Sequence, residues 1–177
     1  MRFDSRRSPI MARNGMVSTT QPLAAMAGVR VLMQGGNAVD AAVATAAALN
    51  VVEPFSTGVG GDVFALVRMA HDSQVTALNA SGRSAAAASL DELVDKGMNE
   101  IPNQSPYAVT VPGAVSGWQA IIDRYGNIGL ADALKPAIEY AEDGFPVSEI
   151  ISHHWDFSAS RLESGPGGPE MLLNGKP

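Results

Sequence analysis

The fold of this protein is decided by one stretch of its sequence, Gly35-Gly36-Asn37-Ala38-Val39-Asp40-Ala41-Ala42-Val43-Ala44-Thr45-Ala46-Ala47-Ala48-Leu49-Asn50. Within it, Asn37 can cap a helix, and Asp40 three residues later complements the positive N-terminal end of that helix. The helix is predicted to reach about Asn50. It is apolar on almost every side, which is typical of a helix buried over most of its surface.

A second apolar helix is predicted just before this stretch, over residues 23–34. Pro22 suits its first turn and Gly35-Gly36 ends it, and we expect this helix also to be buried nearly all round. Residues 16–20 are partly β-branched and are predicted to form a strand or an extended entry. Residues 1–14 hold four arginines against one aspartate and are interpreted as a flexible leader. No apolar run of signal-peptide length follows them, which favours a cytoplasmic protein.

A β-hairpin is predicted over residues 63–70 and 74–79. The first strand shows no polar alternation before Arg68, so we expect cover on both of its faces. A hairpin this short needs further strands beside it, and the rest of the chain offers few candidates. Part of the sheet is therefore expected to lie in other polypeptide.

The second half of the sequence is predicted to be mainly helical. Ser89 and Glu92 fit a capping box at the start of a short helix. A longer helix is expected to follow residues 111–113, with Gly113 and Gly117 on one face where another element could pack tightly. Two further helices are predicted, over residues 130–143 with an interruption at Pro136 and over residues 148–162.

Composition excludes several classes of function. Of the 177 residues, 46% are hydrophobic and 17% charged, which indicates a folded core rather than disorder. The formal net charge of −6 argues against a nucleic-acid partner. The sequence has no cysteine, so it has no thiol nucleophile, disulfide or cysteine-ligated zinc site. The apolar runs are also too short for a membrane span.

Most polar motifs favour a structural interpretation. The glycine-rich loop at residues 58–61 lacks the Lys-Ser/Thr ending of a phosphate-binding loop, so a close backbone approach, structural or beside a site, is favoured over nucleotide binding. His153 and His154 are adjacent and point different ways on a helix, which favours solvated or capping histidines over a metal site. No spacing pairs a hydroxyl with a base among Thr19, Thr20, Ser56 and Thr57.

Arg83 follows the second strand on a bend of small residues. A guanidinium at such a place can bind a carboxylate through two parallel hydrogen bonds, which a lysine cannot do. On chemistry alone, an ordinary surface ion pair is the more frequent role of an arginine.

Taken together, these segments resemble the start of the large subunit of the gamma-glutamyltransferases (gamma-glutamyltranspeptidases), which are N-terminal-nucleophile hydrolases. The resemblance spans about residues 15–177, and the Gly-Gly-Asn-Ala-Val-Asp-Ala-Ala block in this order is its most specific part. The matching pieces are residues 16–24, 35–44, 52–54, 58–64, 79–83, 111–118, 124–126 and 136–145.

The resemblance implies an α+β fold, a four-layer αββα sandwich of which this chain supplies only the N-terminal part. It implies a zymogen that cleaves itself before a threonine, with that threonine opening a small subunit that is the partner of this one. The reaction would transfer the gamma-glutamyl group of glutathione, or of another gamma-glutamyl compound, to water or an amino acid through an acyl-enzyme. The nucleophile lies downstream, so no catalytic residue is expected in this chain, and the family needs no metal or organic cofactor.

One site residue follows from the resemblance. Arg83 matches the arginine that holds the alpha-carboxylate of the glutamyl group. The better-known motif has an aromatic residue before this arginine and a glutamate after it, whereas Gly82 and Ser84 stand here. That form is similar to the branch with gamma-glutamyltransferase-like proteins and some cephalosporin acylases. A cephalosporin or glutaryl acylase and a non-catalytic scaffold module are therefore the alternatives.

Overall fold

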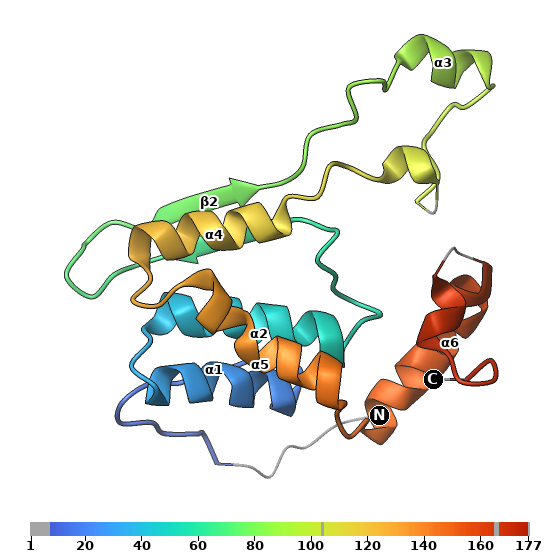
Figure 1. Ribbon diagram of the computed structural model, residues 1–177. Coiled ribbons are helices and arrows are strands. Elements are labelled where there is room, and N and C mark those ends of the chain that lie inside the picture. Colours follow the sequence, from blue (N-terminus) through green and yellow to red (C-terminus); the bar gives the residue numbers. More distant parts are fainter. Residues whose placement is uncertain (1–7, 104, 165–166, 177) are drawn as a thin grey trace.

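The helix predicted from the Asn37 stretch lies at the centre of the protein. A computed structural model describes residues 8–103, 105–164 and 167–176 (Figure 1). Helices α1, α2 and α5 lie side by side, and α4 packs on the hairpin of β1 and β2 (Figure 1). The elements are α1 (Pro22–Met33), α2 (Ala38–Val52), β1 (Val63–Val67), β2 (Thr76–Ala80), α3 (Leu90–Asp95), η1 (Pro106–Ala108), α4 (Ala114–Tyr125), α5 (Leu130–Asp143), α6 (Glu149–Ser164) and η2 (Gly168–Met171).

Two reciprocal interactions start α2 where the sequence predicts. The Asn37 side-chain oxygen accepts hydrogen bonds from the backbone N–H groups of Val39 (2.8 Å) and Asp40 (3.2 Å). The Asp40 carboxylate accepts a hydrogen bond from the backbone N–H of Asn37 at 2.8 Å, which completes a capping box. α2 then continues to Val52, slightly beyond the predicted end.

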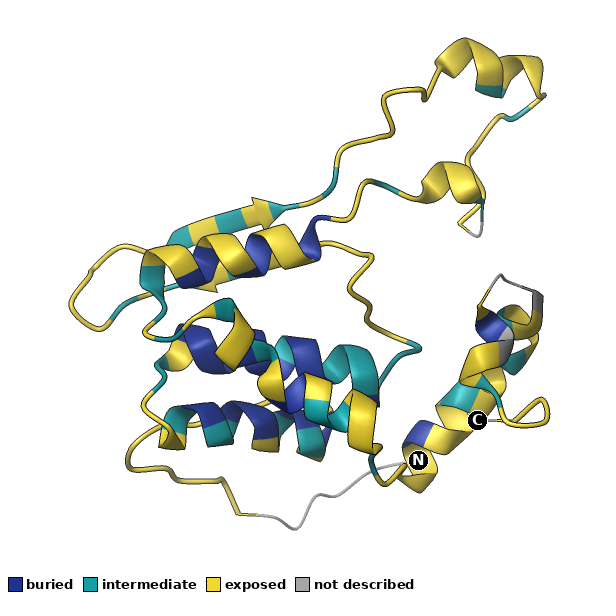
Figure 2. Cartoon of the chain, in the orientation of Figure 1, coloured by how far each residue is buried: buried dark blue, intermediate teal, exposed yellow. Residues whose placement is uncertain are grey.

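The hydrophobic core gathers around α2 (dark blue in Figure 2). The burial predicted for α2 is confirmed, because most of its side chains are inaccessible to solvent. The same expectation for α1 is wrong: only one side of α1 is buried, while Met26 and Met33 on its outer side are 53% and 82% exposed. Core members from the four helices are Ala24, Ala27, Val43, Ala47, Val52, Trp118, Ile121, Ala133 and Ala137.

The interruption predicted at Pro136 does not occur, because α5 is continuous from Leu130 to Asp143. A proline inside a helix lacks the N–H that would bond the carbonyl four residues earlier. Here the ring of Pro136 is buried beside Ala133 and Ala137, which pack in the core with α2. Burial of this apolar face offsets the missing hydrogen bond, and tertiary packing overrides the local preference.

The hairpin is antiparallel, with Val63 opposite Ala80 and Val67 opposite Thr76. Both strands are shorter than predicted because the turn takes more residues. The described residues supply cover for only one of the two faces expected to be covered: α4 packs on one face, and the other exposes Phe64 (67%) and Leu66 (78%). The sheet within the described residues therefore has two strands and one bare apolar face.

The N-terminal region of the described chain contains no strand. Residues 16–20 run along α2 in an irregular conformation, and no strand pairing forms there within the described part. Residues 8–14 of the expected leader are exposed and carry no helix or strand, while residues 1–7 lie outside the described residues.

The close approach predicted for the glycine face of α4 is confirmed. A Cβ built on Gly117 would lie 2.3 Å from Val63 Cγ1 and 2.6 Å from the Cβ of Ala80. A Cβ on Gly113 would lie 2.2 Å from the Ala80 carbonyl oxygen. These two glycines let the backbone of α4 rest directly on the hairpin.

Gly117→Ala in the full-length protein is therefore expected to lower the free energy of unfolding by about 1–3 kcal/mol, because the added methyl forces α4 and the hairpin apart. Denaturant unfolding followed by circular dichroism measures the change. Gly58→Ala is the matched control, because a Cβ at Gly58 meets nothing within 4 Å. Equal unfolding midpoints for the two variants would contradict the packing described here.

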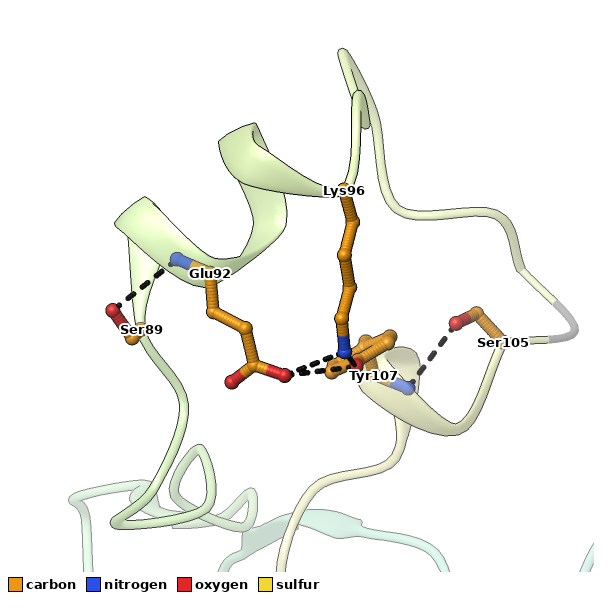
Figure 3. Close-up of polar contacts among 5 residues, drawn as sticks. All are labelled: Ser89, Glu92, Lys96, Ser105 and Tyr107. Carbon is orange, nitrogen blue, oxygen red and sulfur yellow. Dashed lines mark hydrogen bonds and ion pairs between the residues drawn. The ribbon is translucent and has the colours of Figure 1, made fainter.

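Residues 84–110 form an arm that projects from the body and carries α3 and η1 (Figure 1). The capping box predicted for α3 is only half formed: Ser89 Oγ accepts from the backbone N–H of Glu92 at 3.5 Å. The Glu92 carboxylate turns instead toward Lys96 Nζ (2.6 Å) and Tyr107 Oη (3.1 Å) (Figure 3). Lys96 Nζ also donates to Tyr107 Oη, so three side chains join α3 to η1.

Glu92 and Lys96 in this contact stay charged across the neutral pH range. The hydrogen bond from Lys96, and then that from Tyr107, lowers the pKa of Glu92 below 4.5, while the hydrogen bond to Glu92 raises the pKa of Lys96 above 10.5. An acid whose pKa is lowered on folding stabilises the fold above its unfolded pKa, and this stabilisation is lost as the pH falls through the lowered pKa. A base whose pKa is raised on folding stabilises the fold below its unfolded pKa, and this stabilisation is lost as the pH rises through the raised pKa. The contact between α3 and η1 therefore contributes its full stabilisation between about pH 4.5 and 10.5.

Candidate substrate-binding site

The backbone on both sides of Arg83 is held by hydrogen bonds. Asp62 Oδ1 accepts from the backbone N–H of Gly82 at 2.7 Å, and the Arg83 carbonyl accepts from the backbone N–H of Val111 at 2.9 Å. A Cβ on Gly82 would lie 1.7 Å from the Val111 carbonyl oxygen, so only glycine fits there. The departure from the better-known motif at this position thus has a steric cause.

The side chain of Arg83 is exposed, and it makes no hydrogen bond or ion pair with any residue that the structure describes. The ordinary surface ion pair considered from the sequence is therefore not seen in this part of the protein. The held backbone removes one part of the ordering cost of binding a carboxylate, and the planar guanidinium limits the side-chain entropy lost per hydrogen bond formed.

The glycine-rich loop lies beside this arginine rather than at a phosphate site. Its Gly61 carbonyl accepts from the backbone N–H groups of Gly113 (3.0 Å) and Ala114 (2.9 Å) at the start of α4. These donors would otherwise be free to bind an anion. Because the next residue, Asp62, bonds to Gly82, the loop links the start of α4 to the Arg83 bend.

Two of the hydroxyl groups noted in the sequence meet at one carboxylate. Thr20 Oγ1 donates to Glu53 Oε2 at 2.6 Å, and Ser56 Oγ donates to Glu53 Oε1 at 2.5 Å. Glu53 therefore ties the segment before α1 to the loop after α2. Its role was missed in the sequence, where the only signal is an acidic residue directly after a long apolar helix.

The paired histidines take part in aromatic packing. The ring of His154 stacks on Phe55 with centroids 5.5 Å apart and an interplanar angle of 29°, and His153 lies 5.9 Å from His154. Among the described residues there is no cluster of three His, Asp or Glu side chains suited to a metal ion. No described helix combines the length and apolarity that crossing a membrane requires.

Among the described residues, Arg83 thus presents an exposed guanidinium on a hydrogen-bonded bend, which suits an anionic group of a substrate. Arg83 remains a prediction from the sequence, and the residues that hold its backbone, Asp62 and Val111, were not predicted. Asp62 ends the glycine-rich loop, which was a usable signal, whereas nothing local indicated that Val111 would return to this bend.

Comparison with known proteins places these features in a family. The family model described as gamma-glutamyltranspeptidase matches residues 24–177. The glutathione hydrolase-like YwrD proenzyme of Bacillus subtilis is 43% identical over 158 residues, which are 89% of this chain and 30% of that protein. The chain spans about a third of the length of the curated relatives it matches.

Solved structures show the same fold. The gamma-glutamyltranspeptidase of Helicobacter pylori superposes with a TM-score of 0.84 at 32% identity, over 93% of this chain and 48% of that one. The cephalosporin acylase of Bacillus halodurans superposes with a TM-score of 0.78 at 41% identity, over 93% of this chain and 32% of that one. The expected α+β, N-terminal-nucleophile hydrolase fold, with this chain supplying part of it, is confirmed.

A family model that covers most of the chain and solved neighbours of the same fold point to one conclusion. The chain belongs to the gamma-glutamyltranspeptidase family.

Proposed function

We propose that this chain is the N-terminal part of a glutathione hydrolase or gamma-glutamyltransferase. The enzyme takes the gamma-glutamyl group of glutathione, or of another gamma-glutamyl compound, as an acyl-enzyme on a threonine of the small subunit. It then passes that group to water or to an amino acid. In this reaction the chain supplies the wall of the site and the Arg83 anchor for the alpha-carboxylate.

The observation that supports the proposal is the state of Arg83. Its side chain is exposed and unpaired among the described residues, while Asp62 and Val111 hold the backbone on either side. An exposed cation that no described residue neutralises is suited to an anionic substrate group, and a guanidinium matches a carboxylate with two parallel hydrogen bonds.

The partner is proposed to be the small subunit of the same precursor. Relatives in this family are named proenzymes, which indicates a precursor cleaved into two subunits. The bare face of β1, with Phe64 and Leu66 exposed, agrees with a further layer of protein on that side.

The second candidate is an acylase that accepts a glutaryl group. Gly82 and Ser84 flank Arg83, and a cephalosporin acylase is 41% identical to this chain. Both substrates end in a carboxylate that Arg83 could hold. They differ in the alpha-amino group, which glutamyl has and glutaryl lacks.

Side-by-side kinetics on the purified full-length protein separate these candidates. We expect kcat/KM for a gamma-glutamyl anilide to exceed that for the matching glutaryl anilide by about tenfold or more, since binding the ammonium group is worth at least one charged hydrogen bond. The reverse ratio would assign the acylase reaction. A precursor that neither cleaves itself nor turns over either substrate would favour the non-catalytic scaffold.

A further inference from the structure

The bend before Arg83 is fixed by hydrogen bonds rather than by packing. Ser81 and Arg83 are exposed, Gly82 has no side chain, and no apolar side chain from the bend enters the core. The backbone N–H of Ser81 donates to Asn79 Oδ1 at 3.0 Å, a bond within the bend itself. An exposed segment without buried apolar contacts opens easily, so its order depends on the few bonds that tie it to the rest of the protein.

One side chain from a distant segment ties this bend down among the described residues, that of Asp62. Its Oδ1 accepts the backbone N–H of Gly82 at 2.7 Å, directly before Arg83. Asp62 forms no ion pair with the Arg83 guanidinium in the described part of the chain. The carboxylate thus holds the backbone of the bend and leaves the neighbouring cation free for another anion.

Asp62 is itself held on both sides. The preceding Gly61 carbonyl accepts from the backbone N–H groups of Gly113 (3.0 Å) and Ala114 (2.9 Å) at the start of α4. The following residue, Val63, begins the pairing of β1 with β2. The Asp62 carboxylate is therefore presented to the bend from a backbone that is bonded to α4 on one side and to the hairpin on the other.

We propose that Asp62 is a positioning residue for the Arg83 anchor and sets the affinity for the substrate carboxylate without touching the substrate. The inference rests on the proposed function, in which Arg83 holds that carboxylate. A hydrogen bond to a charged acceptor is stronger than one between neutral groups. Without it, Gly82 regains the wide backbone freedom of glycine. The bend then has to be ordered when the substrate binds, and that ordering lowers the affinity.

Asp62→Ala in the full-length enzyme is expected to raise the KM for a gamma-glutamyl anilide about tenfold and to leave kcat within about twofold, because binding is weakened and the reacting bond is not. Asp72→Ala is the matched control. Asp72 Oδ1 also accepts one backbone N–H, that of Gln74 at 2.9 Å, but it lies in the hairpin turn at the far end of the strands. Equal KM values for the two variants would overturn the proposal.

Asp62→Asn separates the hydrogen bond from the charge. The amide keeps an oxygen that can accept the Gly82 N–H, so this variant is expected to recover most of the affinity and to stay within about threefold of the unsubstituted enzyme. An equal rise in KM for Asp62→Asn and Asp62→Ala would assign the effect to the negative charge and would overturn the positioning role.

Combining the variants shows whether the effect passes through Arg83. Adding Asp62→Ala to Arg83→Ala is expected to change kcat/KM by less than about twofold, because the group being positioned is already gone. A further tenfold loss in the double variant would show that Asp62 acts independently of Arg83, and would overturn the proposal.

A pair of ligands separates positioning from direct contact. The carboxylate is common to a gamma-glutamyl anilide and the matching glutaryl anilide, so Asp62→Ala is expected to raise the KM of the first and the inhibition constant of the second by the same factor. A loss confined to the gamma-glutamyl compound would place Asp62 on the alpha-ammonium group and would overturn the positioning role.

The two proposals fail in different ways. An unchanged KM for Arg83→Ala, or a full-length protein that turns over no gamma-glutamyl anilide, would refute the proposed function. A raised KM for Arg83→Ala beside an unchanged KM for Asp62→Ala would refute only the positioning role of Asp62.

Discussion

Replacing Arg83 with alanine in the full-length enzyme is expected to raise the KM for glutathione by about 30-fold to a few thousand-fold. Removing one partner of a desolvated, hydrogen-bonded charge pair costs about 2–5 kcal/mol in binding, which corresponds to that range. Little of the loss can be recovered by relaxation, because the backbone around Arg83 is held by Asp62 and Val111. Initial rates over a range of glutathione concentrations measure the change.

Two further variants complete this experiment. Arg83→Lys keeps the charge without the planar fork and is expected to recover only part of the affinity. Arg30→Ala is the matched control, because Arg30 forms a surface ion pair with Glu139 at 2.8 Å, away from the Arg83 bend. A KM for Arg83→Ala equal to that of Arg30→Ala would remove Arg83 from the site.

Asp40→Ala is expected to lower the free energy of unfolding by about 2–5 kcal/mol, because it leaves several backbone donors without an acceptor. Asp40 is completely buried. Its carboxylate accepts from the backbone N–H groups of Asn37 (2.8 Å), Asn127 (2.9 Å) and Ile128 (3.4 Å). One side chain thus holds the start of α2 and the turn between α4 and α5. Urea unfolding of the full-length protein, followed by fluorescence, measures the loss.

Asp123→Ala is the control for this variant. Asp123 is an exposed aspartate on α4 that accepts a single side-chain hydrogen bond from Gln119 at 2.6 Å. Its replacement is expected to change the unfolding free energy by less than about 0.5 kcal/mol. An equally small effect of Asp40→Ala would show that the buried carboxylate does not hold the turn.

The contacts of Asn37 and Asp40 show which interactions a local sequence pattern predicts and which it does not. The sequence predicts that Asn37 and Asp40 cap α2, since a capping box involves residues only three positions apart. It gives no sign that the same two side chains bind the chain almost 90 residues later: Asn37 Nδ2 donates to the Tyr125 carbonyl at 2.6 Å. These bonds form only once α4 and α5 have packed on α2.

The candidate site shows the same difference between a residue predicted from a local motif and contacts that come from distant parts of the chain. Arg83 was predicted as a site residue because a family motif is a short string of neighbouring residues. The groups that fix its backbone come from residues 62 and 111, which the hairpin and the return of the arm bring together. No spacing in the sequence encodes that meeting.

By itself the sequence determined the places where helices start and stop and the position of the hairpin, because caps, glycine ends and strand patterns depend on neighbours within a few residues. It also predicted Arg83 as the candidate site residue. Only the tertiary structure decided that α5 runs straight through Pro136, that α1 is buried on one side and that residues 16–20 lie unpaired beside α2. These outcomes depend on which apolar surfaces meet and which strand edges find partners. That balance of burial and hydrogen bonding is settled between segments far apart in the chain.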